Sequence, residues 1–204
     1  MATPLSANAL RLKYLTFASY KNALDSNRTA VVVGATSGIG QACAYRLAEQ
    51  GYKVIAVGRD RPGRADSIIQ TLNSKSTNGI KHEGDIEIPV HEFYPCDAFS
   101  LNNVSLTAKQ ILEQHKKIDV VVLTQGMATT QGFTPTKEGN DEKLTLHYYS
   151  RIAMANALLP ALRESDMKNG PVVVSVLSGG VHSPYKEYSN DPDLKKKLQC
   201  EECC

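Results

Sequence analysis

The stretch from Val31 to Gly40 reads V-V-V-G-A-T-S-G-I-G, and it decides the fold. Three branched apolar residues predict the end of a buried strand, and glycines at 34, 38 and 40 predict a tight turn into a helix. Such a helix presents unpaired N–H groups and the positive end of its dipole to an anion. A β-carbon at these positions would block a phosphate or forbid the turn. The stretch therefore predicts the first half of a dinucleotide-binding βαβ unit.

Apolar segments alternate with helical patterns along the rest of the chain, which predicts an α/β fold with a doubly wound parallel sheet of the Rossmann type. The expected strands cover residues 29–33, 53–57, 92–95, 119–123 and 171–177. The expected helices cover residues 39–50, 65–74, 101–115 and 142–162, with Pro160 kinking or fraying the end of the last one. That last helix has an apolar series at helical spacing, made of Leu144, Tyr148, Ile152, Ala155 and Leu159. Residues 75–90 are polar and predict a surface excursion.

We divide the chain into an N-terminal extension (1–28), a dinucleotide-binding domain (29–185) and an irregular tail (186–204). The extension carries four basic residues and one acidic residue, which is typical of a transit peptide. Its leucines could equally form an amphipathic helix that packs on the domain. We expect a cytoplasmic protein, with a mitochondrial location as the alternative.

Composition excludes several classes of protein. The formal net charge of +2 comes from interspersed acidic and basic residues, so the sequence shows no basic patch of the kind that binds nucleic acid. No apolar run approaches the roughly 20 residues that a membrane helix requires. Cys43 and Cys96 stand singly and predict buried thiols in a reducing compartment. The C-x-x-C-C sequence at 200–204 lacks a further ligand pair, so we expect no metal site.

Residues Val33 to Gly40 resemble the T-G-x-x-x-G-I-G motif of the short-chain dehydrogenase/reductase family, with Val33 in place of the threonine. The resemblance implies an oxidoreductase that binds NAD or NADP and acts on alcohol or carbonyl groups. It also implies cofactor contacts from the turn and the helix start, namely Gly34, Thr36, Ser37, Gly38, Ile39 and Gly40.

The end of the second strand predicts NADP rather than NAD. A carboxylate about 20 residues after the glycines would bind the ribose hydroxyls and repel a 2′-phosphate. Here that position is Gly58, followed by Arg59, whose guanidinium suits a phosphate. The adjacent Asp60 counts against this preference, and Arg59 could be an ordinary surface residue.

The resemblance implies further cofactor contacts on the next strands. Asp97, in P-C-D-A-F, matches the aspartate that receives the adenine amino group, although it could also be a turn or capping residue. Residues 123–126 read L-T-Q-G where the family has N-N-A-G, which places Thr124 and Gly126 at the cofactor and retains only the glycine. His147 takes the place of an asparagine that supports a proton relay in the family.

Ser178 occupies the place of the family's catalytic serine, after the strand V-S-V-L. The Tyr-x-x-x-Lys pair that should follow is not found, because Ser189 and Pro192 stand four residues after Tyr185 and Tyr188. The segment after Ser178 resembles instead the long excursion of the retinol-dehydrogenase-like branch. We therefore expect a C-terminally truncated form whose sheet is incomplete at that edge.

Two functions remain open for such a chain. It could be an NADP(H)-dependent oxidoreductase of alcohols and carbonyls, inactive in this form, or a non-catalytic dinucleotide-binding or regulatory protein. The strand at 171–177 is apolar on both faces, and an exposed edge of this kind favours pairing with another chain. We therefore expect an oligomer or a partner there.

Overall fold

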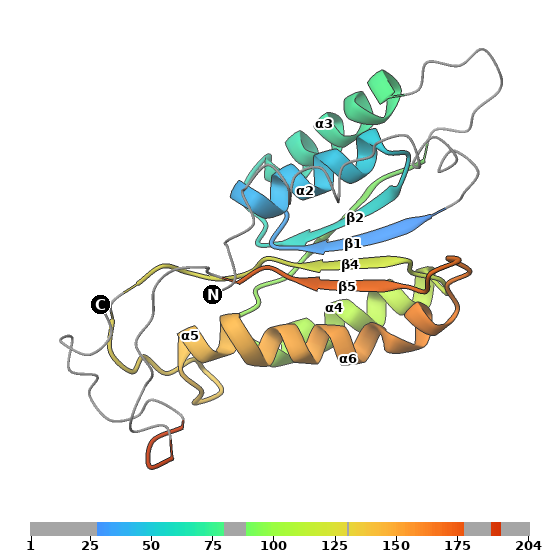
Figure 1. Cartoon of the computed structure of the whole chain (residues 1–204). Coiled ribbons are helices and arrows are strands. Elements are labelled where there is room, and N and C mark those ends of the chain that lie inside the picture. The colour runs from blue at the N-terminus through green and yellow to red at the C-terminus, as the bar shows by residue number, and fades with distance from the viewer. Residues whose placement is uncertain (1–27, 80–88, 130, 178–188, 193–204) are drawn as a thin grey trace, which may run out of the picture.

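The computed structural model of the chain describes residues 28–79, 89–129, 131–177 and 189–192. Its centre is a sheet of five parallel strands in the order β3–β2–β1–β4–β5 (Figure 1). The strands are β1 Thr29–Val33, β2 Lys53–Gly58, β3 Glu92–Pro95, β4 Val120–Leu123 and β5 Val172–Ser175. The strand order reverses between β1 and β4, and this switch point is where doubly wound folds bind ligands.

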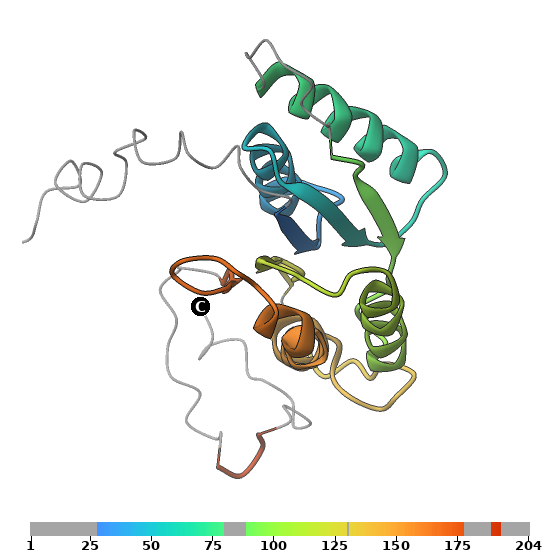
Figure 2. The same ribbon diagram turned by 90° about the vertical axis from the view of Figure 1, so that its right-hand side faces the viewer.

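Helices cover both faces of the sheet, as the doubly wound architecture requires (Figures 1 and 2). One face carries α2 Gly38–Glu49 and α3 Arg64–Gly79. The other carries α4 Leu101–Gln114 and α6 Ser150–Arg163. The short helix α5 Glu142–Leu144 and a π-helical turn, Thr145–Tyr149, lead directly into α6.

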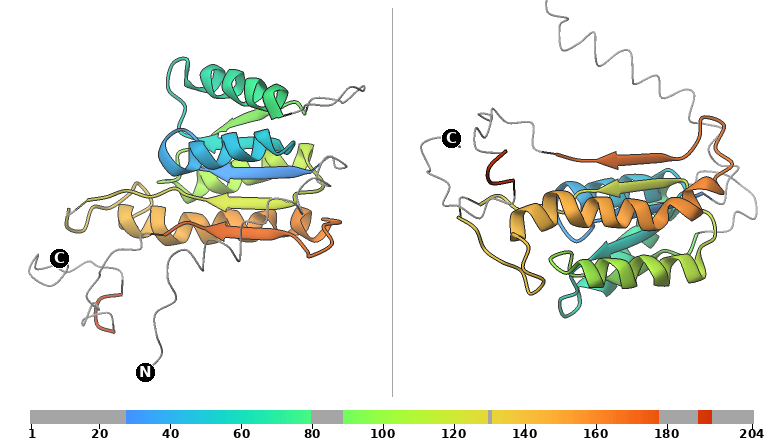
Figure 3. Two further views of the ribbon diagram at one scale, coloured as in Figure 1. Left: turned by 45° about the horizontal axis from the view of Figure 1, so that its top comes forward. Right: turned by 90° about the horizontal axis from the view of Figure 1, so that it is seen from below.

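The core forms two layers because successive residues of a strand point to opposite faces of the sheet. In β1, Val31 and Val33 pack in the layer of α4 and α6. Ala30 and Val32 pack in the layer of α2 and α3. The fold therefore encloses β1 completely, whereas β5 is the outermost of the strands that the structure describes (Figure 3).

The predicted strands all form, and the helices differ from expectation at a few points. Helix α3 continues to Gly79, so residues 75–79 belong to it and not to a surface excursion. The helix expected over 142–162 is interrupted by the π-helical turn. Pro160 lies inside α6 without ending it, because the helix continues to Arg163 although the proline supplies no N–H to the preceding turn. Cys96 is buried, but Cys43 is only partly so.

The apolar series noted at helical spacing is not the buried face of α6. Tyr148, Ile152 and Leu159 are exposed. The buried side consists of Leu146, Met154 and Leu158, with Ala161 and Leu162. Apolar residues occur around most of this helix, so spacing alone does not select the face that packs on the sheet.

Some predictions concern residues outside the described ranges. They include almost all of the extension (1–27), most of the tail and the C-x-x-C-C sequence. Within the described ranges, no helix is long and apolar enough to cross a bilayer. The same ranges hold no cluster of three residues suited to a metal ion.

Candidate functional site

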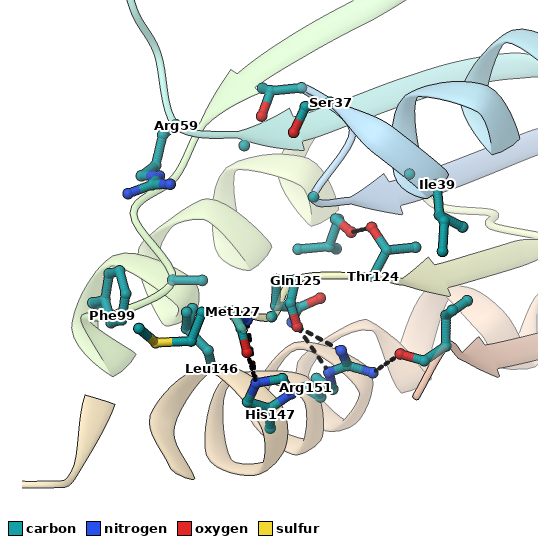
Figure 4. Close-up of a pocket in the computed structure, with 18 of the residues that line it drawn as sticks. Ser37, Ile39, Arg59, Phe99, Thr124, Gln125, Met127, Leu146, His147 and Arg151 are labelled. Atoms are coloured by element: carbon teal, nitrogen blue, oxygen red, sulfur yellow. Dashed lines mark hydrogen bonds between the residues drawn. The ribbon is translucent and has the colours of Figure 1, made fainter. Parts of the chain in front are cut away.

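A cavity of about 690 Å³ opens at the carboxyl ends of the strands, a size typical of ligand pockets (Figure 4). The turns that follow all five strands contribute to its wall, together with the π-helical turn before α6. The structure brings together nearly all the cofactor residues that the sequence predicts, namely Gly34, Thr36, Ser37, Ile39, Gly40, Arg59, Asp97, Thr124 and Gly126. Gly38 alone among those predicted residues does not line the cavity.

The N-terminus of α2 offers free hydrogen-bond donors to the cavity. Ser37 precedes the helix in an extended conformation, and its side chain makes no capping bond. The first backbone bond of the helix runs from Gln41 to Ser37, so the N–H groups of residues 38–40 have no acceptor within the described chain. Gly38 has a φ of +56° with open space around its Cα, a conformation that glycine adopts without strain. This terminus fits a phosphate group.

Gly40 has a packing role at the start of α2. A β-carbon there would collide with the carbonyl oxygen of Gly34 and with Thr124 Oγ1. Thr124 Oγ1 donates a hydrogen bond to Val33 O at 2.8 Å, which fixes it under the turn. The absence of a side chain at Gly40 therefore allows α2 to pack on the strand ends.

The end of β2 has a glycine, Gly58, packed against Thr36 and is followed by a cation, Arg59. A β-carbon at Gly58 would lie 2.6 Å from Thr36 Cγ2, so a carboxylate at this position would require Thr36 to move. The next residue, Arg59, places its guanidinium 5.9 Å from the centre of the Phe99 ring, within cation–π range. Arg59 and Ser37 lie on the same side of the cavity (Figure 4).

Asp97 lines the cavity and also stabilises the turn after β3. Its Oδ1 accepts a hydrogen bond from the N–H of Phe99 at 3.2 Å. The N-cap of α4 is Ser100, whose Oγ accepts from the N–H of Asn103. The turn role that the sequence left open is thus real, and the carboxylate still faces the cavity. Cys96 lines the same wall, where burial raises the pKa of its thiol and keeps it protonated.

Glu138 closes the N-terminus of α4 from a distant loop. Its carboxylate accepts hydrogen bonds from Ser100 Oγ at 2.8 Å, from the N–H of Leu101 at 3.0 Å and from the N–H of Asn102 at 3.1 Å. The bond from Asn102, followed by those from Ser100 and Leu101, lowers the pKa of Glu138. The donors of α4 are therefore satisfied within the chain, whereas those of α2 are not.

His147 forms the wall opposite Arg59 (Figure 4). Its Nε2 lies 2.9 Å from the carbonyl oxygen of Met127 and 3.1 Å from the N–H of that residue. A β-carbon at Gly126 would lie 2.8 Å from His147 Cε1, so this glycine makes room for the imidazole. His147 thus lines the cavity and is tied to the loop after β4.

Arg151 is the main site residue that the sequence analysis missed. It is buried, and its guanidinium donates to the carbonyls of Leu123, Gln125 and Val176 and to Ser175 Oγ. The sequence holds one signal for it: Arg151 follows His147 by four residues, so both lie on one face of the helix. Gln125 adds a buried acceptor, Oε1, that has no partner among the described residues.

The predicted catalytic residue cannot be placed. Val176 and Leu177 line the cavity and are the last described residues before Ser178. Ser178, Tyr185 and Tyr188 lie outside the described ranges.

Sequence comparisons give a consistent family. The family model for short chain dehydrogenases matches residues 28–190. Oxidoreductase AN1596 of Emericella nidulans is 33% identical over 171 residues, which are 83% of this chain and 46% of that protein. Dehydrogenase/reductase SDR family member 7B of Danio rerio is 27% identical over 78% of this chain and 50% of that protein. The chain thus spans about half the length of these relatives.

Solved structures show the same fold at low identity. An alcohol dehydrogenase from the archaeon Thermococcus sibiricus, complexed with 5-hydroxy-NADP, superposes with a TM-score of 0.54 at 22% identity, over 72% of this chain and 57% of that one. The NADP complex of Pseudomonas aeruginosa RhlG gives 0.58 at 23%, over 83% and 63%. NADH-dependent reductase A1-R′, complexed with NAD, gives 0.56 at 20%, over 72% and 58%. From the family match, with this fold and this cavity, the chain belongs to the short-chain dehydrogenase/reductase family.

Proposed function

We propose that this chain binds NADP(H) and supplies the cofactor half of an oxidoreductase that acts on small alcohols or carbonyl compounds. The observation that carries the proposal is the open N-terminus of α2, whose unpaired N–H groups meet the cavity at the switch point of the sheet. The pyrophosphate would lie there, with the adenosine over β2 and β3. When bound, the nicotinamide would supply or accept hydride.

The preference for NADP rests on the end of β2. Thr36 fills the space that a side chain at Gly58 would need, so no carboxylate opposes a 2′-phosphate at that point. The Arg59 guanidinium, held near the Phe99 ring, can pair with the phosphate through charge-assisted hydrogen bonds. Asp97 would receive the adenine amino group on the neighbouring turn, as the family resemblance implies.

Titration of Arg59→Ala with NADPH and with NADH, monitored by cofactor fluorescence, tests this preference. Charge-assisted bonds contribute roughly 1.5–3 kcal/mol, so NADPH affinity should fall about tenfold or more while NADH affinity stays within about twofold. Arg61→Ala is the matched control, because Arg61 is exposed and does not line the cavity. Equal affinities of the unmodified chain for NADPH and NADH would refute the preference.

For catalysis we propose Ser178 as the group that polarises a substrate carbonyl. No Tyr-x-x-x-Lys pair follows Ser178 in the 204 residues, so these residues alone should bind the cofactor with little or no hydride transfer. General acid catalysis typically contributes about 10²–10⁴-fold. The assay follows the absorbance of NADPH with aldehydes and ketones, for the unmodified chain, Ser178→Ala and Tyr188→Phe. Robust turnover that Tyr188→Phe abolishes would show that the chain is a complete enzyme.

A non-catalytic role is the second candidate, and the exposed strand β5 at the edge of the described sheet favours it. In that role the chain would bind a dinucleotide and regulate or pair with a full-length enzyme through the edge of β5. Cofactor binding without turnover, together with altered kinetics of such an enzyme, would support it.

We further propose a reducing compartment such as the cytoplasm, since Cys43 and Cys96 are free thiols within the described residues. Fractionation of cells tests this location.

A further inference from the structure

Arg151 is a buried positive charge in the first turn of α6, with only 4% of its surface exposed. Burial lowers the pKa of its guanidinium, but an arginine remains protonated in proteins. Its partners are all neutral oxygens. Nη1 lies 2.6 Å from Val176 O and 2.9 Å from Ser175 Oγ, and Nε lies 3.1 Å from Gln125 O (Figure 4).

No carboxylate balances this charge in the part of the chain that the structure describes. The ion pairs found there all involve other residues. The guanidinium nevertheless lines the cavity, and Nη2 would lie 3.5 Å from a β-carbon placed on Gly126. Among the described residues the cavity therefore has a fixed positive charge in its wall that no carboxylate compensates, in a setting where water screens it poorly.

The sheet order places this charge at one end of the cofactor. Arg59 follows β2, on the side of β1 where Rossmann folds hold the adenosine ribose. Arg151 touches the ends of β4 and β5, on the other side of β1. A dinucleotide that lies across the switch point would therefore bring its nicotinamide toward Arg151.

The two redox forms of the cofactor differ in charge at that ring. Oxidised nicotinamide carries a positive charge, and the reduced ring carries none, so a fixed cation opposes only the oxidised form. Resting on the proposed function, we propose that Arg151 makes this site prefer the reduced over the oxidised cofactor, which raises the reduction potential of the bound cofactor and makes it a stronger hydride acceptor.

The sharpest test supplies the missing negative charge without removing Arg151. Ser175→Asp places a carboxylate beside Nη1, and Ser175→Asn is its neutral, nearly isosteric control. Dissociation constants for NADPH and NADP⁺ are measured on the whole chain by fluorescence and calorimetry. The unmodified chain and Ser175→Asn should bind NADPH about tenfold more tightly than NADP⁺, and Ser175→Asp should reduce this ratio to about twofold or less.

A second pair of variants separates charge from support of the strand ends. Arg151→Lys retains the charge and should keep the ratio, whereas Arg151→Gln should lose it. A purely structural role of Arg151 would weaken both redox forms alike and leave their ratio unchanged. Unfolding midpoints of all four variants show which of them remain folded, and Ser175 is exposed enough for its variants to fold.

Binding of adenosine 2′,5′-bisphosphate, which lacks nicotinamide, distinguishes the two possible failures. Suppose that adenosine 2′,5′-bisphosphate and NADPH each bind, but the ratio of the NADPH and NADP⁺ affinities is near one or is unchanged in Ser175→Asp. The role of Arg151 is then refuted and the NADP(H) site stands. If neither compound binds, the proposed function itself fails and this inference fails with it.

Discussion

The same tripeptide, V-V-V, occurs in the most enclosed and in the most exposed strand of the described sheet. Val31–Val33 in β1 are 0–2% exposed, whereas Val172–Val174 in β5 are 41–45% exposed. β1 has a strand on each side and helices on both faces, but among the described strands β5 pairs only with β4. The burial of a strand is therefore set by its place in the sheet order, and an identical sequence can be core in one place and edge in another.

The functional site differs in the same way on its two sides. Near β1, backbone groups and the close-packed Gly34 and Gly40 form the wall, so a β-carbon added at either glycine meets protein. Near β5, one long side chain, Arg151, ties the strand ends together. The enclosed side should thus be sensitive to any change of volume or charge, and the open side should tolerate changes that leave Arg151 in place.

Acid provides the largest expected effect, because a buried imidazole, that of His91, lies between the start of β2 and helix α3, in the enclosed part of the sheet and away from the cavity. His91 Nδ1 accepts from the N–H of Val54 and its Nε2 contacts Ser76 Oγ, while burial lowers its pKa to about 4. Between pH 6.5 and 4 the unfolded chain binds the proton and the folded chain does not, so stability falls as the pH falls. The free energy of unfolding should drop by about 3 kcal/mol across this window.

Urea unfolding at several pH values measures this drop, with His91→Asn as the comparison, since an amide oxygen can still accept from Val54. The difference between the two chains isolates the imidazole from the carboxylates that titrate in the same range. An identical pH dependence in both would show that His91 does not carry the effect.

The glycine-rich turn should show the next largest effect. Gly40→Ala forces a β-carbon against backbone and Thr124, and overpacking of this kind should reduce the free energy of unfolding by about 2–3 kcal/mol. Gly38→Ala meets open space and should cost only about 1–2 kcal/mol, through its positive φ. Chemical denaturation compares the two variants. A greater loss in Gly38→Ala would contradict the packing role assigned to Gly40.

A threonine placed in each valine triplet tests directly whether β1 is buried and β5 exposed in solution. Val32→Thr buries a hydroxyl among apolar neighbours and should cost about 2 kcal/mol, since protein mutational data give about 1–3 kcal/mol for an unpaired polar group. Val173→Thr, on the exposed strand, should change stability by less than about 0.5 kcal/mol. Similar losses at both positions would mean that β5 is covered in solution.

Disrupting self-association through β5 should have the smallest effect on the free energy of unfolding, but it should change the size of the particle in solution. An exposed, apolar edge strand favours pairing with a second copy. Val173→Lys should therefore shift the chain toward monomer in light scattering, with a free energy of unfolding changed by less than about 0.5 kcal/mol. Lys168→Ala is a control at an exposed position outside the strand. A monodisperse monomer before any substitution would refute pairing at this edge.

Sequence patterns predicted the elements well where the pattern had one interpretation. The run Val31–Gly40 gave the first strand, its turn and its helix, and β3 formed at the expected residues. The buried face of α6 could not be predicted, because apolar residues occur on several sides of that helix and tertiary packing selects among them. The π-helical turn before it likewise has no signal in the apolar spacing.

Site residues that belong to short contiguous motifs could be predicted from the sequence, whereas those whose partners come from distant segments could not. The α2 turn and Arg59 follow short motifs, and both lie where those motifs place them. Arg151 depends on carbonyl groups from Leu123, Gln125 and Val176, which meet only after the sheet has formed. No spacing in one sequence records such a convergence.

The carboxylate of Glu138 makes the two helix termini at this edge unequal competitors for an anion. The Glu138 carboxylate already accepts the hydrogen bonds at the start of α4. Because it belongs to the same chain, its effective concentration there is high, and a free phosphate would have to displace it. The start of α2 has no such occupant in the described chain. Of these two helix starts, only that of α2 is free within the described chain to receive the pyrophosphate of the proposed dinucleotide, so Glu138 would help to set the orientation of that ligand.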